Sequence, residues 1–526
     1  MRPMPSVMSH DFSRVPRAEI PRSSFDRSHG LKSTFNSGWL VPIFVDEALP
    51  GDTFNLNMTG FARLATPLHP FMDNIFMNTF FFAVPLRLVW NKFQRFMGEQ
   101  PNPGDSTDFV IPQIVSPVGG YTEMDIFDFM GLPTKVPGMS HSALPFRAYN
   151  LIWNEWFRDQ NLQTAAPVIL DDGPDAYTQY VTKNRGKRHD YFTSSLPWPQ
   201  KGDAVDIPLG TSAPLVRISN APSAVGYQAG TNTVIGDGAV NTVGAGLSVG
   251  AAGMSLDLST QASVDLSGAT SATINQLRQA FAIQKLYERD ARGGTRYTEI
   301  IRAHFNVISP DARLQRPEYL GGGQSPVTLH TVPQNAQTGL TGGTTPQGNL
   351  AAYGTAHLSG HGFSKSFTEH CIIIGLVCVR ADLNYQQGLN RMWSRNTKFD
   401  FYWPALSHIG EQAVLNKEIY AQGSVNPTAD AAAWGYQERF AEYRYKPSVI
   451  TGLMRSNAAA SLDTWHLAQD FASLPALNNA FIQENPPIER IIAVPSEPEF
   501  IFDSYFRLRC ARPMPVYGVP GMIDRF

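Results

Sequence analysis

The sequence predicts a mainly β fold in which long connections separate the strands. Composition is the first observation: only 17% of the residues are charged, whereas 43 glycines and 39 prolines indicate many turns. Hydrophobic residues make up 43% of the 526, which is enough to fill a large core. Strand-like segments near both ends favour one sheet system closed by distant parts of the chain. A chain of this length forms either several domains or one core with very large insertions.

Three segments carry the strand prediction. Residues 52–65 alternate between apolar side chains such as Phe54 and polar ones such as Asn55, which is typical of a strand buried on one side. Residues 500–512 alternate in the same way. Residues 74–84 are apolar on both faces, which favours a central strand that is covered twice.

The three cysteines predict free thiols. Cys371 and Cys378 lie seven positions apart in an apolar run that is expected to form one strand. They would therefore be about 23 Å apart on opposite faces, beyond disulfide reach, which favours a reducing compartment. The longest apolar run, residues 371–379, is only about half of a membrane span, and the N-terminal segment lacks a signal-peptide core. We expect neither secretion by this route nor a membrane span.

Composition divides the chain into four regions. Residues 1–37 are basic and contain Pro and Ser, which is typical of an arm and not of a core element. Residues 38–202 and 276–526 contain the strand-like segments. Residues 203–275 are dominated by Gly, Ala, Ser, Thr and Val and hold one aromatic residue, Tyr227. This composition predicts an inserted, surface-displayed module that cannot supply a core of ordinary size.

The connections and one helix complete the predicted architecture. Pro and Gly punctuate residues 98–145 and 308–365, so we expect long irregular stretches that serve as assembly surfaces. A helix should follow the insertion, because Thr273 and Gln276 form a capping box and the glycine pair at 293–294 ends the helical pattern. Within the insertion, LDLS and VDLS indicate short β segments that copies from adjacent subunits could join.

Each short motif that could carry chemistry lacks its structural context. GLSVG at 246–250 matches a nucleophile elbow but lies in the low-complexity insertion. His357 and His361 have the spacing of helical zinc ligands, yet the glycines beside them favour a loop histidine pair. DDGPD at 171–175 lacks the remaining ligands of a calcium loop and is interpreted as a turn. We therefore expect no catalytic residue, no metal site and no cofactor.

The basic arm is the predicted nucleic-acid contact. The net charge of −3 gives no global attraction to nucleic acid, so such contact must be local. Cations of the arm could neutralise phosphates while the phenylalanines between them stack on bases. The candidate residues are Arg14, Arg17, Arg22, Arg27 and Lys32. An arm that only laces a neighbouring subunit is an equal alternative. The arginines within 278–302 alternate with acidic residues and are interpreted as a salt-bridged interface.

Long strings of the sequence carry a family resemblance. They include SHDFSRVPRAEIPRSSFDRSHG, LRQAFAIQKLYERDARGGTRYTEIIRAHF, WGYQERFAEYRYKPS and PVYGVPGMID. These strings resemble the major capsid proteins of the gokushovirus branch of the Microviridae, and the resemblance spans nearly the whole chain except 203–275. It implies an eight-stranded antiparallel jelly roll with long insertions between strands and a few helices. It also implies an icosahedral T=1 shell around circular single-stranded DNA, with the insertion forming protrusions at the threefold axes.

The resemblance also implies the partners of the chain. They are further copies of itself, packaged single-stranded DNA with a small internal DNA-binding protein, minor virion proteins and a receptor on the host cell. We expect a virion protein that is assembled in the bacterial cytoplasm and whose residues 203–275 serve host attachment. The alternative is a β-rich secreted hydrolase or carbohydrate-binding module that uses GLSVG or the His357 pair. The lack of a signal peptide and the odd cysteine count argue against that alternative.

Overall fold

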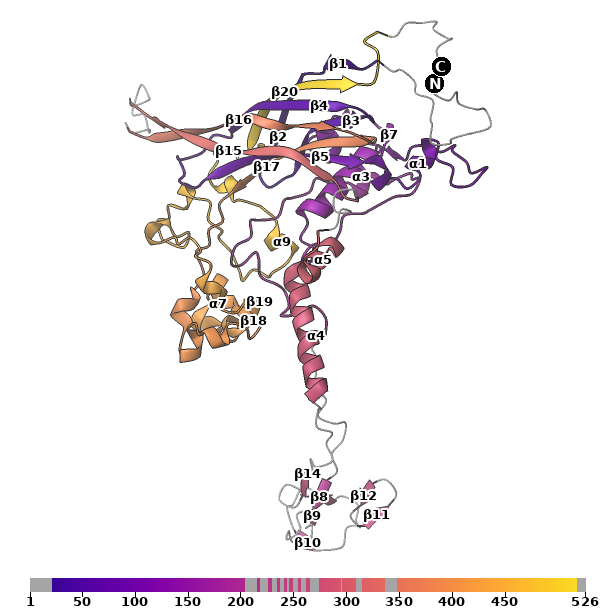
Figure 1. The fold of residues 1–526 in the computed structure, drawn as a ribbon. Coiled ribbons are helices and arrows are strands. Elements are labelled where there is room, and N and C mark those ends of the chain that lie inside the picture. Colours follow the sequence, from indigo (N-terminus) through magenta and orange to yellow (C-terminus); the bar gives the residue numbers. More distant parts are fainter. Residues whose placement is uncertain are drawn as a thin grey trace. The chain divides into compact units, whose positions relative to one another are not determined.

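Figure 1 shows the computed structural model of the chain. It describes residues 21–203, 274–294, 296–308, 315–335 and 348–517, together with the backbone of seven short strands between 204 and 273. The chain divides into two compact units, Met1–Pro199 with Thr295–Phe526 and Gln200–Gly294. Each unit is described separately.

One curled antiparallel sheet organises the first unit. Its strands follow the order β1-β20-β4-β16-β15-β5-β17-β3, and β2 also pairs with β20. The strands are β1 (Ser23–Asp26), β2 (His29–Phe35), β3 (Val41–Ala48), β4 (Thr53–Leu64), β5 (Ile75–Pro85), β15 (Glu318–Pro333), β16 (Leu350–Ser366), β17 (Cys371–Ala381) and β20 (Phe500–Arg512). Because β1 and β2 pair with successive parts of β20, they share one edge position, and the nine strands fill eight positions.

The strand pairing is that of a jelly roll. From the chain ends inward, β1 and β2 pair with β20, β3 with β17, β4 with β16, and β5 with β15, always antiparallel. The sheet is thus one long hairpin that curls into two layers. We call β1, β2, β20, β4 and β16 the first half-sheet, and β15, β5, β17 and β3 the second half-sheet. This topology confirms the predicted eight-stranded antiparallel jelly roll.

The main core lies between the inner faces of the two half-sheets. Burial along β4 alternates strictly from Phe54 to Leu64, as the sequence pattern predicts for a strand with one buried face. Rings from opposite half-sheets meet there: Phe44 lies 5.4 Å from Phe506 between centroids, and Phe81 lies 5.6 Å from Phe363. Burial of these aromatic side chains supplies much of the hydrophobic stabilisation.

The second half-sheet is also covered on its outer face. Phe82 of β5 and Ile374 of β17 pack in a second buried cluster with residues of helix α3 (Leu144–Ile152). Cys371 belongs to the inner cluster and Cys378 to this outer cluster, which confirms that they lie on opposite faces of one strand. All three cysteines are buried free thiols.

Shorter elements fill the connections of the first unit. A small lobe with its own buried cluster surrounds the hairpin of β18 and β19. No helix in the described ranges combines the length and the apolar character that a bilayer crossing requires. The shorter elements are α1 (Phe93–Phe96), β6 (Gln113–Val115), α2 (Ile126–Phe129), β7 (Ser140–Ser142), α5 (Tyr297–Phe305), β18 (Glu411–Leu415), α7 (Asn416–Ile419), α8 (Pro427–Ala431), β19 (Ala433–Glu438) and α9 (Asn479–Ile482).

The second unit contains the predicted helix. Helix α4 spans Ile274–Gly293, as the capping pattern and the terminal glycines predict. The short strands pair within the chain as a three-stranded sheet β10-β9-β13 and as the pairs β11-β12 and β14-β8. β13 ends at Leu256 and β14 at Val264, the first residues of LDLS and VDLS, so the two motifs mostly follow these strands. The remaining strands are β8 (Leu215–Arg217), β9 (Gly226–Gln228), β10 (Val234–Gly236), β11 (Asn241–Val243) and β12 (Gly246–Ser248).

The interpretation of residues 1–37 as an arm is wrong for residues 23–35. These residues form β1 and β2, whose backbone groups are satisfied by β20. Phe35 is fully buried and its ring lies 5.7 Å from that of Phe502, so it packs in the core and cannot stack on a base. The polar composition of this edge strand comes from its exposed outer face.

The expectation of an irregular stretch over 308–365 is also wrong, because β15 and β16 occupy most of it. The glycines that suggested a loop stand where two backbones approach closely. A Cβ atom on Gly321 would lie 2.4 Å from the Gly362 carbonyl oxygen, and one on Gly322 would lie 2.1 Å from the Thr79 carbonyl oxygen. Glycine in this strand is therefore a packing requirement.

This close approach predicts the effect of a single methyl group. Gly322→Ala should lower the free energy of unfolding by about 3 kcal/mol, because β5 and β15 must separate to accept the Cβ atom. Urea unfolding followed by circular dichroism measures this change. Gly119→Ala is the matched control, because nothing lies within 4 Å of a Cβ atom built on Gly119. Equal midpoints for the two variants would contradict the packing explanation.

Candidate functional site

The outer face of the first half-sheet is open, in contrast to the covered outer face of the second. The side chains of Phe61 on β4 and Tyr505 on β20 are both 50% exposed, and Ile501 is 60% exposed. Arg507 lies opposite Asn57 in the pairing of β20 with β4. Exposed residues of one strand therefore pair with exposed residues of the other. We call the outward residues of β4 and β20 the open face: Asn55, Asn57, Thr59, Phe61, Arg63, Ile501, Asp503, Tyr505, Arg507 and Arg509.

Three arginines give the open face its charge. Arg63, Arg507 and Arg509 are exposed, and within the described part of the chain none of them forms an ion pair. Arg507 and Arg509 lie two residues apart and so on the same face. Asp503 is the one carboxylate of the open face, and Lys32 binds it at 3.0 Å. The face therefore combines unpaired guanidinium groups, amides and exposed aromatic rings.

Of the predicted nucleic-acid residues, the three that the structure describes each bind a different partner. Arg14 and Arg17 lie outside the described residues. Arg22 donates a hydrogen bond to Thr53 Oγ1 at 2.6 Å. Arg27 binds both carboxylate oxygens of Asp46, at 2.6 and 2.9 Å, so its charge is already neutralised. Lys32 adjoins the open face, where it pairs with Asp503 across the β2-β20 ladder.

Sequence reasoning missed the arginines of the open face. The signal was present, because Arg63, Arg507 and Arg509 occupy the polar positions of two alternating strands. The sequence does not reveal that β4 pairs with β20. This pairing joins segments more than four hundred residues apart into one surface. Cross-strand neighbours of this kind cannot be derived from the alternation of either strand alone.

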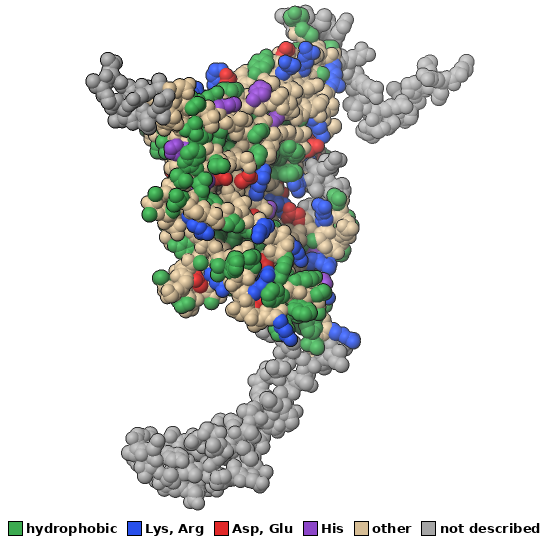
Figure 2. Space-filling model, turned by 90° about the vertical axis from the view of Figure 1, so that its left-hand side faces the viewer, with side chains coloured by type: hydrophobic (Ala, Val, Ile, Leu, Met, Phe, Trp, Pro, Cys, Tyr) green, Lys and Arg blue, Asp and Glu red, His purple; other side chains and the backbone are tan. Residues whose placement is uncertain are grey.

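A second exposed surface is aromatic. Five large rings occur within residues 393–403 of the small lobe, and all are at least half exposed: Trp393, Phe399, Phe401, Tyr402 and Trp403. We call this the aromatic segment. Trp403 Nε1 donates to the Lys398 carbonyl oxygen at 2.8 Å, which holds the turn in shape. Figure 2 shows hydrophobic side chains gathered in several places on the face turned to the viewer. Exposed aromatic clusters of this size usually mark protein interfaces.

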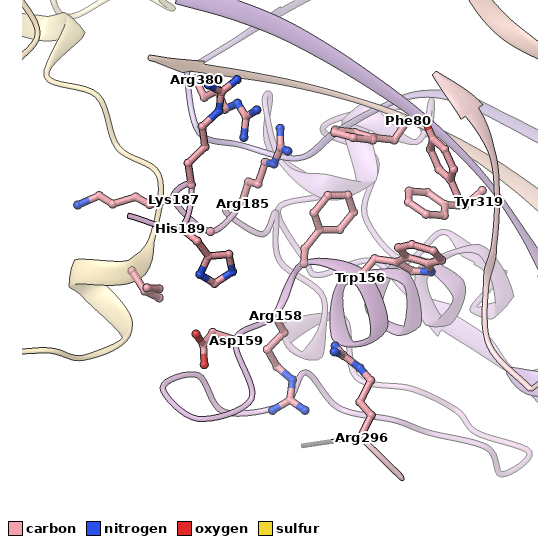
Figure 3. Close-up of a pocket in the computed structure, with 15 residues that line it drawn as sticks. Phe80, Trp156, Arg158, Asp159, Arg185, Lys187, His189, Arg296, Tyr319 and Arg380 are labelled. Atoms are coloured by element: carbon pink, nitrogen blue, oxygen red, sulfur yellow. The ribbon is translucent and has the colours of Figure 1, made fainter. Parts of the chain in front are cut away.

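A pocket of about 560 Å³ lies on the outer side of the second half-sheet. Figure 3 shows rings such as Phe80, Trp156 and Tyr319 along one side, with Arg185 and Arg380 among the cations along another. Six of its fifteen lining residues are Arg or Lys, and Asp159 is the one carboxylate among them. This charge balance is unusual for a pocket in a chain of slightly negative net charge.

The histidine pair does not form a zinc site. His357 and His361 both lie on β16, not in the expected loop, and a register shift separates them. His357 is exposed, whereas His361 is buried and hydrogen-bonded to Thr79 at 2.8 Å and Ser325 at 3.1 Å. Burial lowers the pKa of His361, which favours its neutral form. Among the described residues no group of three metal-ligating side chains occurs.

Of the other two motifs, DDGPD has a structural role, and GLSVG lies only partly within the described residues. Asp175 of the DDGPD segment is buried and binds Arg147, and Trp90 Nε1 donates to Asp172 Oδ1 at 2.8 Å. These acidic side chains therefore hold the covering loops. Ser248 of GLSVG ends strand β12, which forms a hairpin with β11, and the last two residues of the motif lie outside the described residues.

Comparison with known proteins decides the family. A family model described as capsid protein (F protein) matches residues 13–522. The capsid protein VP1 of Bdellovibrio phage phiMH2K is 50% identical over 537 aligned residues, covering 98% of each chain. The capsid protein VP1 of Chlamydia phage 1 is 46% identical with 99% of each chain covered, and that of Spiroplasma virus 4 is 37% identical with 98% of this chain and 97% of its own covered. The chain belongs to the phage capsid F protein family.

Family membership confirms the resemblance to gokushovirus capsid proteins of the Microviridae. This capsid protein is a major structural protein of a small phage and a component of its virion, not an enzyme. The secreted-hydrolase alternative is thereby excluded. A capsid protein assembles with copies of itself into a shell.

Proposed function

We propose that many copies of this capsid protein form an icosahedral T=1 shell around circular single-stranded DNA. The observation that supports this proposal is the asymmetry of the jelly roll, which has one bare outer face and one outer face covered by long insertions. A subunit with two chemically different sides can place one toward a genome and the other toward solvent. In this proposal the partners include a small internal DNA-binding protein and minor virion proteins, and assembly takes place in the bacterial cytoplasm.

The open face is the surface that we assign to packaged DNA. Arginines bind phosphates through bidentate hydrogen bonds, and exposed rings on a flat sheet stack on unpaired bases. Arg507 and Arg509 supply the first kind of contact, while Phe61 and Tyr505 supply the second. Sheets that bind single strands commonly use this combination. The contribution of Arg14, Arg17, Arg22, Arg27 and Lys32 stays a prediction.

Neutralising the open face should weaken DNA retention in a salt-dependent way. The triple variant Arg63→Gln, Arg507→Gln and Arg509→Gln removes three possible phosphate contacts. The slope of log affinity for octathymidylate against log salt should become shallower by about 2, because each contact with a single strand releases about 0.7 counterion. Fluorescence anisotropy at several salt concentrations measures this slope on the full-length chain.

A matched triple variant controls for the loss of charge alone. Arg95, Lys135 and Arg444 are exposed cations on other surfaces, with 38%, 72% and 56% of their side chains accessible. Replacing them by Gln should leave the slope within about 0.5 of the original value. If both triple variants changed the slope equally, the open face would have no special role.

We further propose that residues 203–275 form the protrusions at the threefold axes and attach the phage to its host. The support is compositional: the insertion holds a single aromatic residue and lies in the sequence between the two parts of the jelly roll. Large insertions are tolerated because the entropy of loop closure grows slowly with length. The jelly roll should therefore fold without this segment.

Removing the insertion separates assembly from attachment. Replacing residues 206–272 by a short Gly-Ser bridge should leave shells intact but reduce adsorption to host cells to background, because the contact surface is lost while the sheet is unchanged. Electron microscopy counts the shells, and plaque assays with adsorption kinetics measure attachment. Normal infection by this variant would refute the attachment role, and complete absence of shells would show that the segment is needed for assembly.

A further inference from the structure

The pocket on the second half-sheet contains cations that repel one another. Burial, together with the neighbouring charges of Arg185 and Arg188, lowers the pKa of Arg380 to about 10. Burial also lowers the pKa of Arg158, with Arg296 adding to the effect. Burial and like charges therefore both disfavour the charged form of these arginines.

Hydrogen bonding in the pocket is incomplete as well. Buried nitrogen atoms of three lining arginines have no hydrogen-bond partner in the described part of the chain: Arg158 Nε, Arg185 Nη1 and Arg380 Nε. Unpaired buried donors of charged groups are costly, and native structures rarely leave several in one place. Their common location points to an acceptor-rich ligand.

The carboxyl groups around the pocket do not complete it. Asp159 accepts the backbone N–H groups of Asn161 and Leu162 and so is occupied by its own turn. Glu484 interacts with Lys187, Arg380 and Arg185, but burial raises its pKa to about 7, which disfavours its charged form relative to an exposed glutamate. Arg188 is partly neutralised by Asp382 at 3.6 Å. Arg296 pairs with Glu155 at 3.4 Å and with Glu299 at 3.0 Å. Among the described residues, Arg158, Arg185 and Arg380 form no salt bridge.

The aromatic side of the pocket is partly free. The side chains of Trp156 and Tyr319 are 41% and 43% exposed, and their rings lie 6.1 Å apart between centroids. Trp156 is fixed by a hydrogen bond from its Nε1 to the Pro317 carbonyl oxygen at 2.9 Å and by Arg316 stacked at 4.4 Å. A rigid, partly exposed pair of rings next to a cation cluster suits a ligand that joins an anion to a flat or sugar ring.

We propose that this pocket binds a phosphate monoester attached to a ring, with the phosphate among Arg158, Arg185 and Arg380 and the ring against Trp156 and Tyr319. Arginine favours phosphate because its planar fork makes two parallel hydrogen bonds. The volume of about 560 Å³ admits a nucleotide or a phosphorylated sugar. The pocket lies on the covered side of the jelly roll, so this binding is independent of DNA on the open face.

Thermal melting of the full-length chain with small probes tests the proposal. Inorganic phosphate, ribose 5-phosphate and thymidine 5′-monophosphate should each raise the melting temperature, whereas uncharged ribose and thymidine should not. Calorimetric titration should show that Arg185→Gln combined with Arg380→Gln weakens binding of all three anions at least roughly tenfold. Arg95→Gln, an exposed arginine outside the pocket, should leave the three affinities unchanged.

Two further variants make the test independent of folding defects. Arg380→Gln alone should melt no earlier than the original chain without ligand, because it removes a charge that the folded state disfavours. Trp156→Leu should reduce the affinities of ribose 5-phosphate and thymidine 5′-monophosphate roughly fivefold while sparing inorganic phosphate. If thymidine 5′-monophosphate loses more affinity than ribose 5-phosphate, Trp156 contacts a base. If the two lose affinity equally, Trp156 contacts the sugar.

Absence of a melting shift with every anion would overturn the proposal. The same conclusion would follow if the double arginine variant bound the anions as tightly as the original chain. Thermal melting and calorimetric titration both use the unassembled chain, so a failure to form shells does not affect either measurement.

Discussion

Replacing Asp175 by alanine should lower the free energy of unfolding by about 3 to 5 kcal/mol, because it leaves the buried charge of Arg147 without a carboxylate partner. Only 2% of the Arg147 side chain is accessible, and its Nε and Nη2 donate to the two carboxylate oxygens of Asp175 at 2.8 and 2.6 Å. Tyr180 donates to the same carboxylate at 2.5 Å. Arg147 Nη1 also binds the Val89 carbonyl oxygen. The pair therefore ties helix α3 to two loops that cover the second half-sheet.

Urea unfolding of the full-length chain measures the Asp175 effect. The exposed pair of Lys32 and Asp503 is the control: 81% and 55% of its side chains are accessible, so Lys32→Ala should cost less than about 1 kcal/mol. A similar small loss for Asp175→Ala would show that the covering loops do not depend on this ion pair.

Replacing Trp393 and Trp403 by serine should abolish shell formation while leaving the subunit folded. Trp393 is 71% exposed and Trp403 is 50% exposed, so neither contributes much to the core. We assign the aromatic segment to contacts between copies because a shell must bury such surface, and aromatic anchors dominate interface energies, each costing about 2 kcal/mol or more on truncation. The loss is repeated at every contact in a closed shell, so its effect on assembly multiplies.

Light scattering reports the particles, and circular dichroism reports the folded subunit. Val118→Ser is the matched control, because Val118 is 95% exposed but lies outside the aromatic segment. It should assemble normally. If the double tryptophan variant gave as many particles as the original chain, the aromatic segment would not be part of the assembly surface.

Strong strands were predictable because their side chains alternate against a single core. β4 and β20 follow the predicted segments 52–65 and 500–512 nearly to the residue, and the double-sided apolar pattern of 74–84 corresponds to β5. Helix α4 likewise begins and ends where its capping signals predict. In each case local sequence and tertiary environment favour the same structure.

Strands β1, β2, β15 and β16 lie in segments that the sequence predicted to be an arm or irregular. In β15 and β2, the local signals opposed the fold. The glycines of β15 resemble a loop, although close backbone approach at Gly322 requires them. The edge strand β2 shows a polar sequence because its outer face is exposed, and its pairing partner β20 lies more than four hundred residues away. Propensity cannot report such distant pairing.

The functional surfaces depend still more on tertiary structure. The open face requires the register between β4 and β20, and the phosphate pocket gathers side chains from the helical turn Trp153–Phe157 after α3, from β5, β15 and β17, and from the loop 185–189. No contiguous motif encodes either surface. The family, in contrast, was predictable, because long strings of the sequence resemble known capsid proteins.

Electron cryomicroscopy of particles purified with their DNA shows which surface of the subunit faces the genome. We expect closed icosahedral shells in which the open face, with Arg507 and Arg509, points toward the DNA density, and the aromatic segment lies at contacts between subunits. Shells in which the open face points outward, or preparations that contain only unassembled subunits, would contradict this expectation.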